Sequence, residues 1–167
     1  VFAEIARNVT AGERLYLVVH DRRHEASARK VLQKVGVDLT QVHFVVKATD
    51  RGWMRDSGAI VTRSSGDGRV AVRFRFNAWA KYENWRKDVT FSPSAARRMK
   101  LPVVDVVHNE RPVVLEGGAI DVNGVGTLLA TEECLLSPDV QVRNPRFTAA
   151  DYEAVFDRYL GAHKTIW

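Results

Sequence analysis

The sequence has a single cysteine, no long apolar run and no cluster of one charge. Because Cys134 is the one cysteine among 167 residues, no disulfide can form within the chain, and nothing indicates an oxidising compartment. No segment approaches the roughly 18 apolar residues that a membrane-spanning helix requires. Residues 1–11 mix Glu4 and Arg7 into an apolar stripe, which is unlike a signal peptide. We therefore expect a cytoplasmic protein without a membrane partner.

Basic residues exceed acidic ones but are spread along the chain. There are 25 Lys and Arg against 20 Asp and Glu, a net charge of +5, and no run of five or more basic residues occurs. This pattern disfavours nucleic acid as a partner. With 46% hydrophobic and 27% charged residues, the composition is typical of a globular protein, and we expect one domain over residues 1–167.

Neither a metal ion nor a cofactor is expected. His20 and His24 have the spacing of two zinc ligands on a helix, but His20 is expected at a strand end and a third ligand is lacking. Cys134 lies in an apolar setting without a nearby histidine, where a thiol is usually buried and unreactive.

Helical patterns occur in four places. The N-terminal residues before Gly12 and residues 25–34 carry apolar side chains at helical spacing. A third, short helix is expected from Ser94, as its cap, to residue 99. The fourth covers residues 152–159, where Thr148 and Asp151 resemble a capping box and Gly161 ends the helix.

Strand patterns alternate with these helices. Apolar runs predict strands over residues 15–19, 42–46, 60–62, 70–76, 103–107, 113–116, 119–122, 127–131 and 164–167, with 103–107 buried. The Asp67–Gly68 pair and residues 123–126 are typical of hairpin turns. Because the order of strand, helix, strand and hairpin occurs nearly twice, we expect an α/β fold of repeated units. The last strand would expose an edge unless further chain or a partner covers it.

The densest group of polar and aromatic residues is the loop at residues 49–58. Asp56 can form paired hydrogen bonds with a planar cation, and the ring of Trp53 can stack on the same cation, so the pair suits a guanidinium. The alternative is structural: Arg55 pairs with Asp50 or Asp56 in a solvated turn while Trp53 fills the core.

A second group lies at residues 114–124. The paired glycines Gly117 and Gly118 allow close approach of the backbone to a ligand, and Glu116 lies where a strand ends, so its carboxylate would point into a cleft. The alternative is a β-bulge with a surface glutamate.

A third group lies at residues 72–82. Arg73 and Arg75 alternate with apolar residues, which places both guanidinium groups on one face of a strand. Two neighbouring arginines can hold a carboxylate, or they can be the solvent face of a half-buried strand.

Together and in this order, these segments resemble the agmatine deiminase family, which includes the Porphyromonas-type peptidylarginine deiminases. The resemblance covers roughly residues 40 to 167. The matching segments are Trp53-Met54-Arg55-Asp56 with Gly58, Phe76-Asn77-Ala78-Trp79 with Lys81-Tyr82, Leu115-Glu116-Gly117-Gly118, Gly124-Val125-Gly126-Thr127, Thr131-Glu132-Glu133-Cys134-Leu135-Leu136 and Arg143-Asn144-Pro145.

The resemblance implies a pentein fold, an α/β propeller of five ββαβ units around a pseudo-fivefold axis. This chain would be the N-terminal portion of that single domain, about two to three of the five units, with no separate second domain. The implied activity is hydrolysis of a guanidinium to a ureido group and ammonia through a cysteine thiouronium, without a cofactor. Expected partners are a small guanidine substrate, either agmatine or an arginine derivative, the missing C-terminal half or a second chain, and a second copy in a homodimer.

The resemblance also assigns roles to residues. Asp56 would hold the substrate's guanidinium as a catalytic residue, and the substrate-binding residues would be Trp53, Glu116, Gly117, Gly118, Arg73 and Arg75. In the family, the nucleophilic cysteine and a His-x-Asp pair lie downstream of the segment that ends at Trp167, and Cys134 matches a non-catalytic position. The alternative is therefore a non-catalytic substrate-binding or structural fragment of the same fold. Asp121 replaces a histidine common in agmatine-specific members, which leaves the substrate open.

Overall fold

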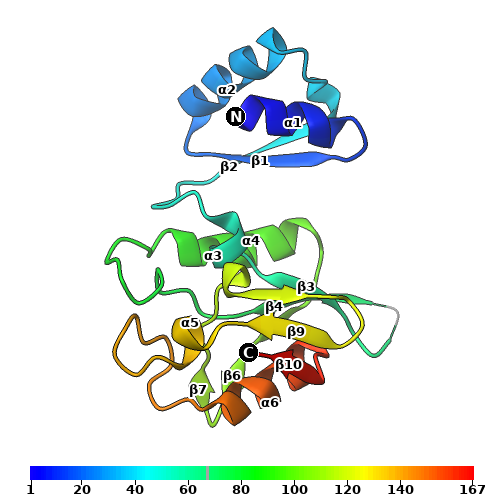
Figure 1. Ribbon diagram of the computed structural model, residues 1–167. Helices are drawn as coiled ribbons and strands as arrows, with labels where there is room; N and C mark the ends of the chain where they lie inside the picture. Colours follow the sequence, from blue (N-terminus) through cyan, green and yellow to red (C-terminus); the bar gives the residue numbers. More distant parts are fainter. Residues whose placement is uncertain (67) are drawn as a thin grey trace. The chain divides into compact units, whose positions relative to one another are not determined.

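The structure is a computed structural model that describes residues 1–66 and 68–167 (Figure 1). The chain separates into two compact units, Val1–Thr49 and Asp50–Trp167. None of the helices in the described part of the chain combines the length and the apolar character that a membrane span requires.

The first unit is a parallel strand pair joined by a helix. The strands β1 (Leu15–Val19) and β2 (Val42–Val46) match the predicted strands at 15–19 and 42–46, and they pair in parallel. Ala6, Leu32, Val37 and Val42 form a small core. Of the apolar stripe on the first helix only Ala6 is buried, whereas Phe2 and Ile5 are exposed. The elements are α1 (Phe2–Thr10), β1 (Leu15–Val19), α2 (Arg22–Lys34), the 3-10 helix η1 (Leu39–Gln41) and β2 (Val42–Val46).

The second unit contains the order hairpin, helix, strand twice. In each case the hairpin is antiparallel and the strand after the helix pairs in parallel with the second hairpin strand. The first repeat consists of β3 (Ile60–Arg63), β4 (Arg69–Arg73), α4 (Phe91–Arg98) and β5 (Val103–Asp105). The second consists of β8 (Ile120–Val122), β9 (Thr127–Ala130), α6 (Ala149–Leu160) and β10 (Lys164–Ile166). The predicted mixed α/β fold is therefore confirmed.

Short elements connect these repeats. They are α3 (Met54–Ser57), the 3-10 helix η2 (Asp88–Thr90), the hairpin strands β6 (Val107–His108) and β7 (Arg111–Pro112), the 3-10 helix η3 (Gly117–Ala119) and α5 (Glu132–Leu136). The β6–β7 turn was not predicted. Its central residues, Asn109 and Glu110, have φ angles of 48° and 63°, which matches the twist of a two-residue hairpin.

In the second unit, α6 packs on the sheet of β8, β9 and β10 (Figure 1). The core at this contact also includes side chains of the first repeat. Buried side chains from both repeats meet there, among them Val72 of β4, Leu128 of β9 and Phe156 of α6. Asn144 fixes the segment before β8, because its side chain accepts from the N–H of Val114 at 2.9 Å and donates to the Val114 carbonyl at 2.7 Å.

Three predicted strands differ from the structure. The strand expected over 70–76 ends at Arg73, because the backbone of Arg75 bonds to Val113 and Leu115 instead, through a single parallel bridge at Val114. This bridge is what remains of the strand expected over 113–116. The strand expected to be buried over 103–107 covers Val103–Asp105 and is exposed, since β5 pairs with β4 alone within the described residues.

Two further predictions, a helix cap at Ser94 and a turn at Asp67–Gly68, are not confirmed. Ser94 does not cap the helix: α4 begins at Phe91, and the Ser94 hydroxyl donates to the Thr90 carbonyl one turn earlier. The turn prediction at Asp67–Gly68 lies partly outside the described residues, since residue 67 is not among them.

The capping box at the start of α6 is confirmed. The Thr148 hydroxyl accepts from the N–H of Asp151, and the Asp151 carboxylate accepts from the backbone of Thr148 at 2.8 Å. The His108 ring lies 2.9 Å from the same carboxylate and joins the β6–β7 hairpin to the helix. Gly161, at a φ of 66°, ends the helix as predicted.

We expect this capping box to weaken in acid. Hydrogen bonds from Thr148, and then from His108, lower the pKa of Asp151 to about 2. The ionised carboxylate therefore contributes stability that is present above about pH 4 and is lost as the pH falls through the folded-state pKa. Over that range, the unfolding temperature measured by circular dichroism should fall more steeply in the wild type than in Asp151→Asn. Asp139→Asn, at an exposed position, is the control. Equal slopes of unfolding temperature against pH in all three proteins contradict the prediction.

Candidate functional site

The loop that carries Asp56 and the paired glycines are in contact. Asp56 lies in the single turn of α3, and its Oδ1 accepts from the N–H of Gly118 at 2.9 Å. The neighbouring Arg55 donates from Nε to the Gly117 carbonyl at 2.9 Å and from Nη2 to Ile120 at 3.4 Å. Two segments that are 62 residues apart in the sequence are thereby joined.

The close approach explains why both positions are glycine. A Cβ at Gly117 would lie 2.3 Å from the Arg55 carbonyl oxygen, and a Cβ at Gly118 would lie 2.4 Å from Oδ1 of Asp56. Either distance is shorter than any non-bonded contact that a side chain tolerates, so the backbones can meet only without a Cβ.

A buried aspartate anchors the start of the same loop. The carboxylate of Asp88 accepts from the backbone N–H of Asp50 at 2.8 Å and of Arg51 at 3.1 Å. In return the carboxylate of Asp50 accepts from the N–H of Lys87 at 2.9 Å. Because these bonds fix the backbone just before Trp53, they hold the direction in which the loop enters α3.

Glu116 is a buried acid with an incomplete set of partners. Its side chain is 1% exposed, and Nε of Arg143, itself buried, donates to its Oε2 at 3.2 Å. The other oxygen, Oε1, is buried without a hydrogen-bond partner. Burial raises the pKa of Glu116, the charge of Arg143 opposes this, and the charge of Asp56 adds to it. A carboxylate in this position is suited to accept from a cationic donor.

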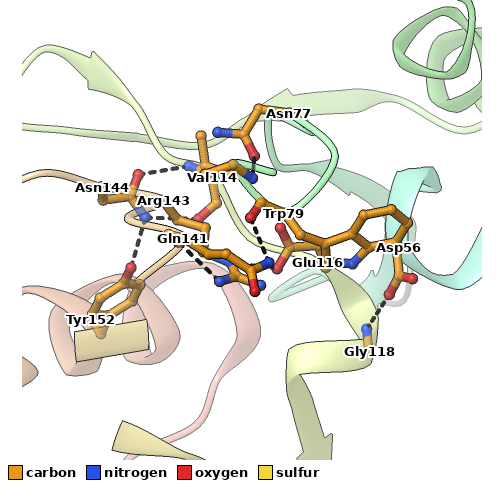
Figure 2. Close-up of polar contacts among 11 residues, drawn as sticks. Asp56, Asn77, Trp79, Val114, Glu116, Gly118, Gln141, Arg143, Asn144 and Tyr152 are labelled. Atoms are coloured by element: carbon orange, nitrogen blue, oxygen red, sulfur yellow. Dashed lines mark hydrogen bonds and ion pairs between the residues drawn. The ribbon is translucent and has the colours of Figure 1, made fainter. Parts of the chain in front are cut away.

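Asp56 and Glu116 occupy corresponding positions in the two repeats. Asp56 lies four residues before Ile60, the first residue of β3, and Glu116 lies four residues before Ile120, the first residue of β8. A single helical turn accompanies each acid, α3 in one case and η3 in the other. The two carboxyl groups are near enough for the charge of Asp56 to act on Glu116 (Figure 2).

Aromatic rings gather beside these acids. Trp53 is 59% exposed, and its ring meets that of Trp79 edge to face at 6.2 Å. Trp79 makes similar contacts with Phe76 at 5.3 Å and Tyr82 at 5.9 Å. Rings arranged in this way offer faces on which a delocalised cation can stack.

The turn that carries Trp79 has an unusual backbone. Residues 78–80 all have left-handed φ angles, between 50° and 61°. Two side chains hold the turn: Oδ1 of Asn77 accepts from the N–H of Ala80 at 2.9 Å, and Nε2 of Gln141 donates to the Trp79 carbonyl at 2.9 Å.

The structure separates the candidate residues into two groups. It brings Trp53, Asp56, Glu116, Gly117 and Gly118 together, but it does not bring the two arginines to them. Arg73 forms a two-point ion pair with Asp105 at 2.5 and 2.7 Å. Both Arg73 and Arg75 line a cavity of about 430 Å³, to which neither Asp56 nor Glu116 contributes.

For the loop at residues 49–58 and for Glu116, the structural alternatives considered from the sequence are wrong. Arg55 bonds to backbone carbonyls rather than to a carboxylate, Asp50 pairs with Lys87, and Trp53 is exposed rather than buried in the core. Glu116 is buried rather than on the surface of a bulge.

Sequence reasoning assigned no role to Gln141, Arg143 or Asp88. Arg143 belonged to a segment that matches the family, but nothing in its immediate sequence indicated a buried partner. Cys134 is half-buried, and burial raises the pKa of its thiol, which favours the unreactive form. Within residues 1–66 and 68–167, no three His, Cys, Asp or Glu side chains are grouped so as to hold a metal ion.

The arrangement has the chemical features of a site for a planar cation. One carboxylate is oriented by a backbone N–H, a second is buried with a free oxygen, and aromatic rings lie beside them. The chain is thus a mixed α/β protein with two ββαβ repeats, and the segments before β3 and β8, the first strands of these repeats, form a joint acidic centre.

Comparison with known proteins identifies the family. The model of the Porphyromonas-type peptidyl-arginine deiminase family matches residues 1–167, and the chain belongs to this family. Two curated relatives, from Selenomonas ruminantium and Vibrio parahaemolyticus, both bear the name "putative agmatine deiminase" and are 38% and 34% identical to this chain over 100% and 99% of its length. The family resemblance found in the sequence is confirmed.

A solved structure shares the fold. An agmatine deiminase from C. jejuni with substrate bound has a TM-score of 0.80 and 25% identity to this chain. The match covers 99% of this chain and 45% of the C. jejuni chain. The chain also spans less than half of the two curated relatives, 44% and 43%.

Proposed function

We propose that the protein is a deiminase that hydrolyses the guanidinium group of agmatine or of free or peptidyl arginine to a ureido group and ammonia. In this proposal, residues 1–167 supply the part of the site that binds and orients the guanidinium. The observation that carries it is the buried Glu116, whose Oε1 lacks a hydrogen-bond donor beside the carboxylate of Asp56. The names of the relatives support the same reaction class.

The chemistry of the substrate fits these groups. A guanidinium is planar, permanently charged and has N–H groups along its edges, so two carboxylates can fix its plane through charge-assisted hydrogen bonds. Asp56, whose Oδ1 accepts from the N–H of Gly118, would accept from N–H groups on one edge of the guanidinium. Oε1 of Glu116 would accept from an N–H on another edge. The ring of Trp53 or Trp79 would cover a face of the cation. Arg73 would not contact the substrate, because the carboxylate of Asp105 already neutralises its charge.

The reaction also needs a nucleophile and a proton carrier. A cysteine thiolate attacks the central carbon, an amine nitrogen leaves as ammonia after protonation, and water hydrolyses the resulting thiouronium to the ureido product and free thiol. Cys134 is unsuited to this role because burial raises its pKa. We place the nucleophilic cysteine and the His-x-Asp pair in the part of the relatives' length that residues 1–167 do not match.

The proposal extends to the architecture. The two ββαβ repeats, together with the strand, helix and strand of the first unit, support a propeller in which residues 1–167 form two to three of five units of one domain. In that arrangement the loops before the hairpins would face a common axis, where the guanidinium binds.

The test combines the mass of the native protein with an ammonia assay. We expect the protein at its natural length to release ammonia from agmatine or from a peptide containing arginine, with saturation kinetics. A native mass near 18.8 kDa without ammonia release from either compound rejects the enzyme and favours the non-catalytic fragment.

A further inference from the structure

A continuous set of hydrogen bonds joins Glu116 to the backbone of Trp79 (Figure 2). Arg143 donates from Nε to Oε2 of Glu116 at 3.2 Å and from Nη1 to the Gln141 carbonyl at 2.9 Å. Gln141 in turn donates from Nε2 to the Trp79 carbonyl at 2.9 Å. The acid and the aromatic turn, which are far apart in the sequence, are thereby fixed to each other.

Both ends of the Gln141 link have a strained backbone. Gln141 has a φ of 48° and Trp79 a φ of 61°, in the left-handed region that residues with a Cβ adopt at a cost. Residues held in this conformation persist only where the surroundings fix them, and they are often found at functional sites. The hydrogen bond from Gln141 to the Trp79 carbonyl is one of the contacts that hold these residues in place.

The ion pair of Arg143 and Glu116 is not explained by stability. Both side chains are buried, and the two meet through a single bond of 3.2 Å rather than through a paired contact. The desolvation of a buried ion pair usually cancels its attraction, so such pairs contribute little to folding. What the pair does supply is a fixed orientation for Glu116 and a cation that favours its charged form.

We propose that Arg143 and Gln141 are positioning residues of the guanidinium site: Arg143 keeps Glu116 ionised and oriented, and Gln141 ties this pair to the aromatic wall at Trp79. The inference rests on the proposed function. It adds the means by which the buried acid and the aromatic face are held in one geometry.

Four charged or titratable groups lie near Glu116. Arg143 contacts it directly, the carboxylate of Asp56 lies on α3, Cys134 lies on α5 and the Tyr152 hydroxyl lies on α6. Of these, Arg143 lowers the pKa of Glu116 while burial and Asp56 raise it. Without Arg143 the pKa therefore rises further, and the neutral acid, which cannot balance a guanidinium, persists to higher pH.

The test is the pH dependence of substrate binding in Arg143→Gln, in the protein at its natural length, with agmatine and an arginine-containing peptide as probes. An opposite charge in contact typically lowers a carboxyl pKa by about one unit or more, so the acid limb of the KM profile should move to higher pH by about one unit or more, with KM on that limb up to about tenfold above the wild type. The KM should recover as the pH is raised, and kcat at saturating substrate should change less. Arg143→Lys, which retains the charge, should shift the profile less than Arg143→Gln. The exposed Arg111→Gln is the control and should match the wild type.

Gln141→Ala tests the second link without touching the ion pair. We expect a raised KM with no shift along the pH axis, and a smaller change in tryptophan fluorescence on binding, because the turn at Trp79 is released. If Arg143→Gln unfolds, as judged by circular dichroism, Arg143→Met takes its place, because it also removes the charge.

A pH profile for Arg143→Gln, or for the equally neutral Arg143→Met where the first variant does not fold, that coincides with the wild type overturns the role of Arg143. An unchanged KM in Gln141→Ala overturns the role of Gln141. In either case saturable turnover by the wild type leaves the proposed function standing, whereas a wild type that binds neither probe overturns both.

Discussion

Asp56→Asn is expected to lower kcat/KM for the guanidine substrate by about a hundredfold or more. The amide keeps an oxygen that can accept from the N–H of Gly118, so the loop stays in place, but the negative charge that balances the cation is lost. The free energy of unfolding should change by less than about 1 kcal/mol, because Asp56 is only half-buried in the single turn of α3 and has no ion pair among the described residues. Steady-state kinetics and thermal unfolding measure the two effects separately.

The comparison with Asp139→Asn isolates the charge at the site. Asp139 is exposed, so its substitution changes the net charge by the same amount without touching the acidic centre. If Asp56→Asn binds and turns over substrate as well as Asp139→Asn does, Asp56 has no part in holding the guanidinium.

The two neighbouring glycines are expected to fail in different ways when replaced with alanine. In Gly118→Ala the new Cβ would lie 2.4 Å from Oδ1 of Asp56, the end of a side chain that can rotate away, so the protein folds but the carboxylate is displaced. A displacement of about 1 Å costs roughly a hundredfold in rate. In Gly117→Ala the Cβ would lie 2.3 Å from a backbone oxygen of Arg55, which cannot rotate away, so the loss should be about 1–3 kcal/mol of stability.

Gly12→Ala serves as the control for both variants, since a Cβ there meets nothing within 4 Å. Thermal unfolding and steady-state kinetics on all three proteins test the distinction. A Gly118→Ala protein with full activity would show that the contact between the paired glycines and Asp56 does not position the carboxylate.

Local signals in the sequence predicted local structure well. The strands at 15–19 and 42–46 agree with the structure residue for residue, because in each case a largely apolar run of strand length is bounded by polar residues. The capping box of Thr148 and Asp151 depends on two residues three positions apart, so it is legible in the sequence. Ser94 misled for the same reason: it has the chemistry of a cap, but the helix begins a turn earlier.

What the sequence could not give were contacts between distant segments. Arg143 meets Glu116 across 27 positions, and Gln141 meets Trp79 across 62. No periodicity encodes such pairs, because they depend on how the repeats pack. The placement of Arg73 and Arg75 shows the same limit: alternation put both on one strand face, but the partner of Arg73, Asp105, is supplied by the neighbouring strand β5.

The equal offset of Asp56 and Glu116 from the hairpins that follow them has an evolutionary consequence. If one ancestral unit carried an acid before its first strand, each duplication of the gene segment would add an acid around the same centre, with no new geometry to invent. Divergence between copies would then alter the surroundings of each acid: one is half-buried, and the other is enclosed with an arginine. A symmetric origin would thus yield two chemically unequal acids at one centre.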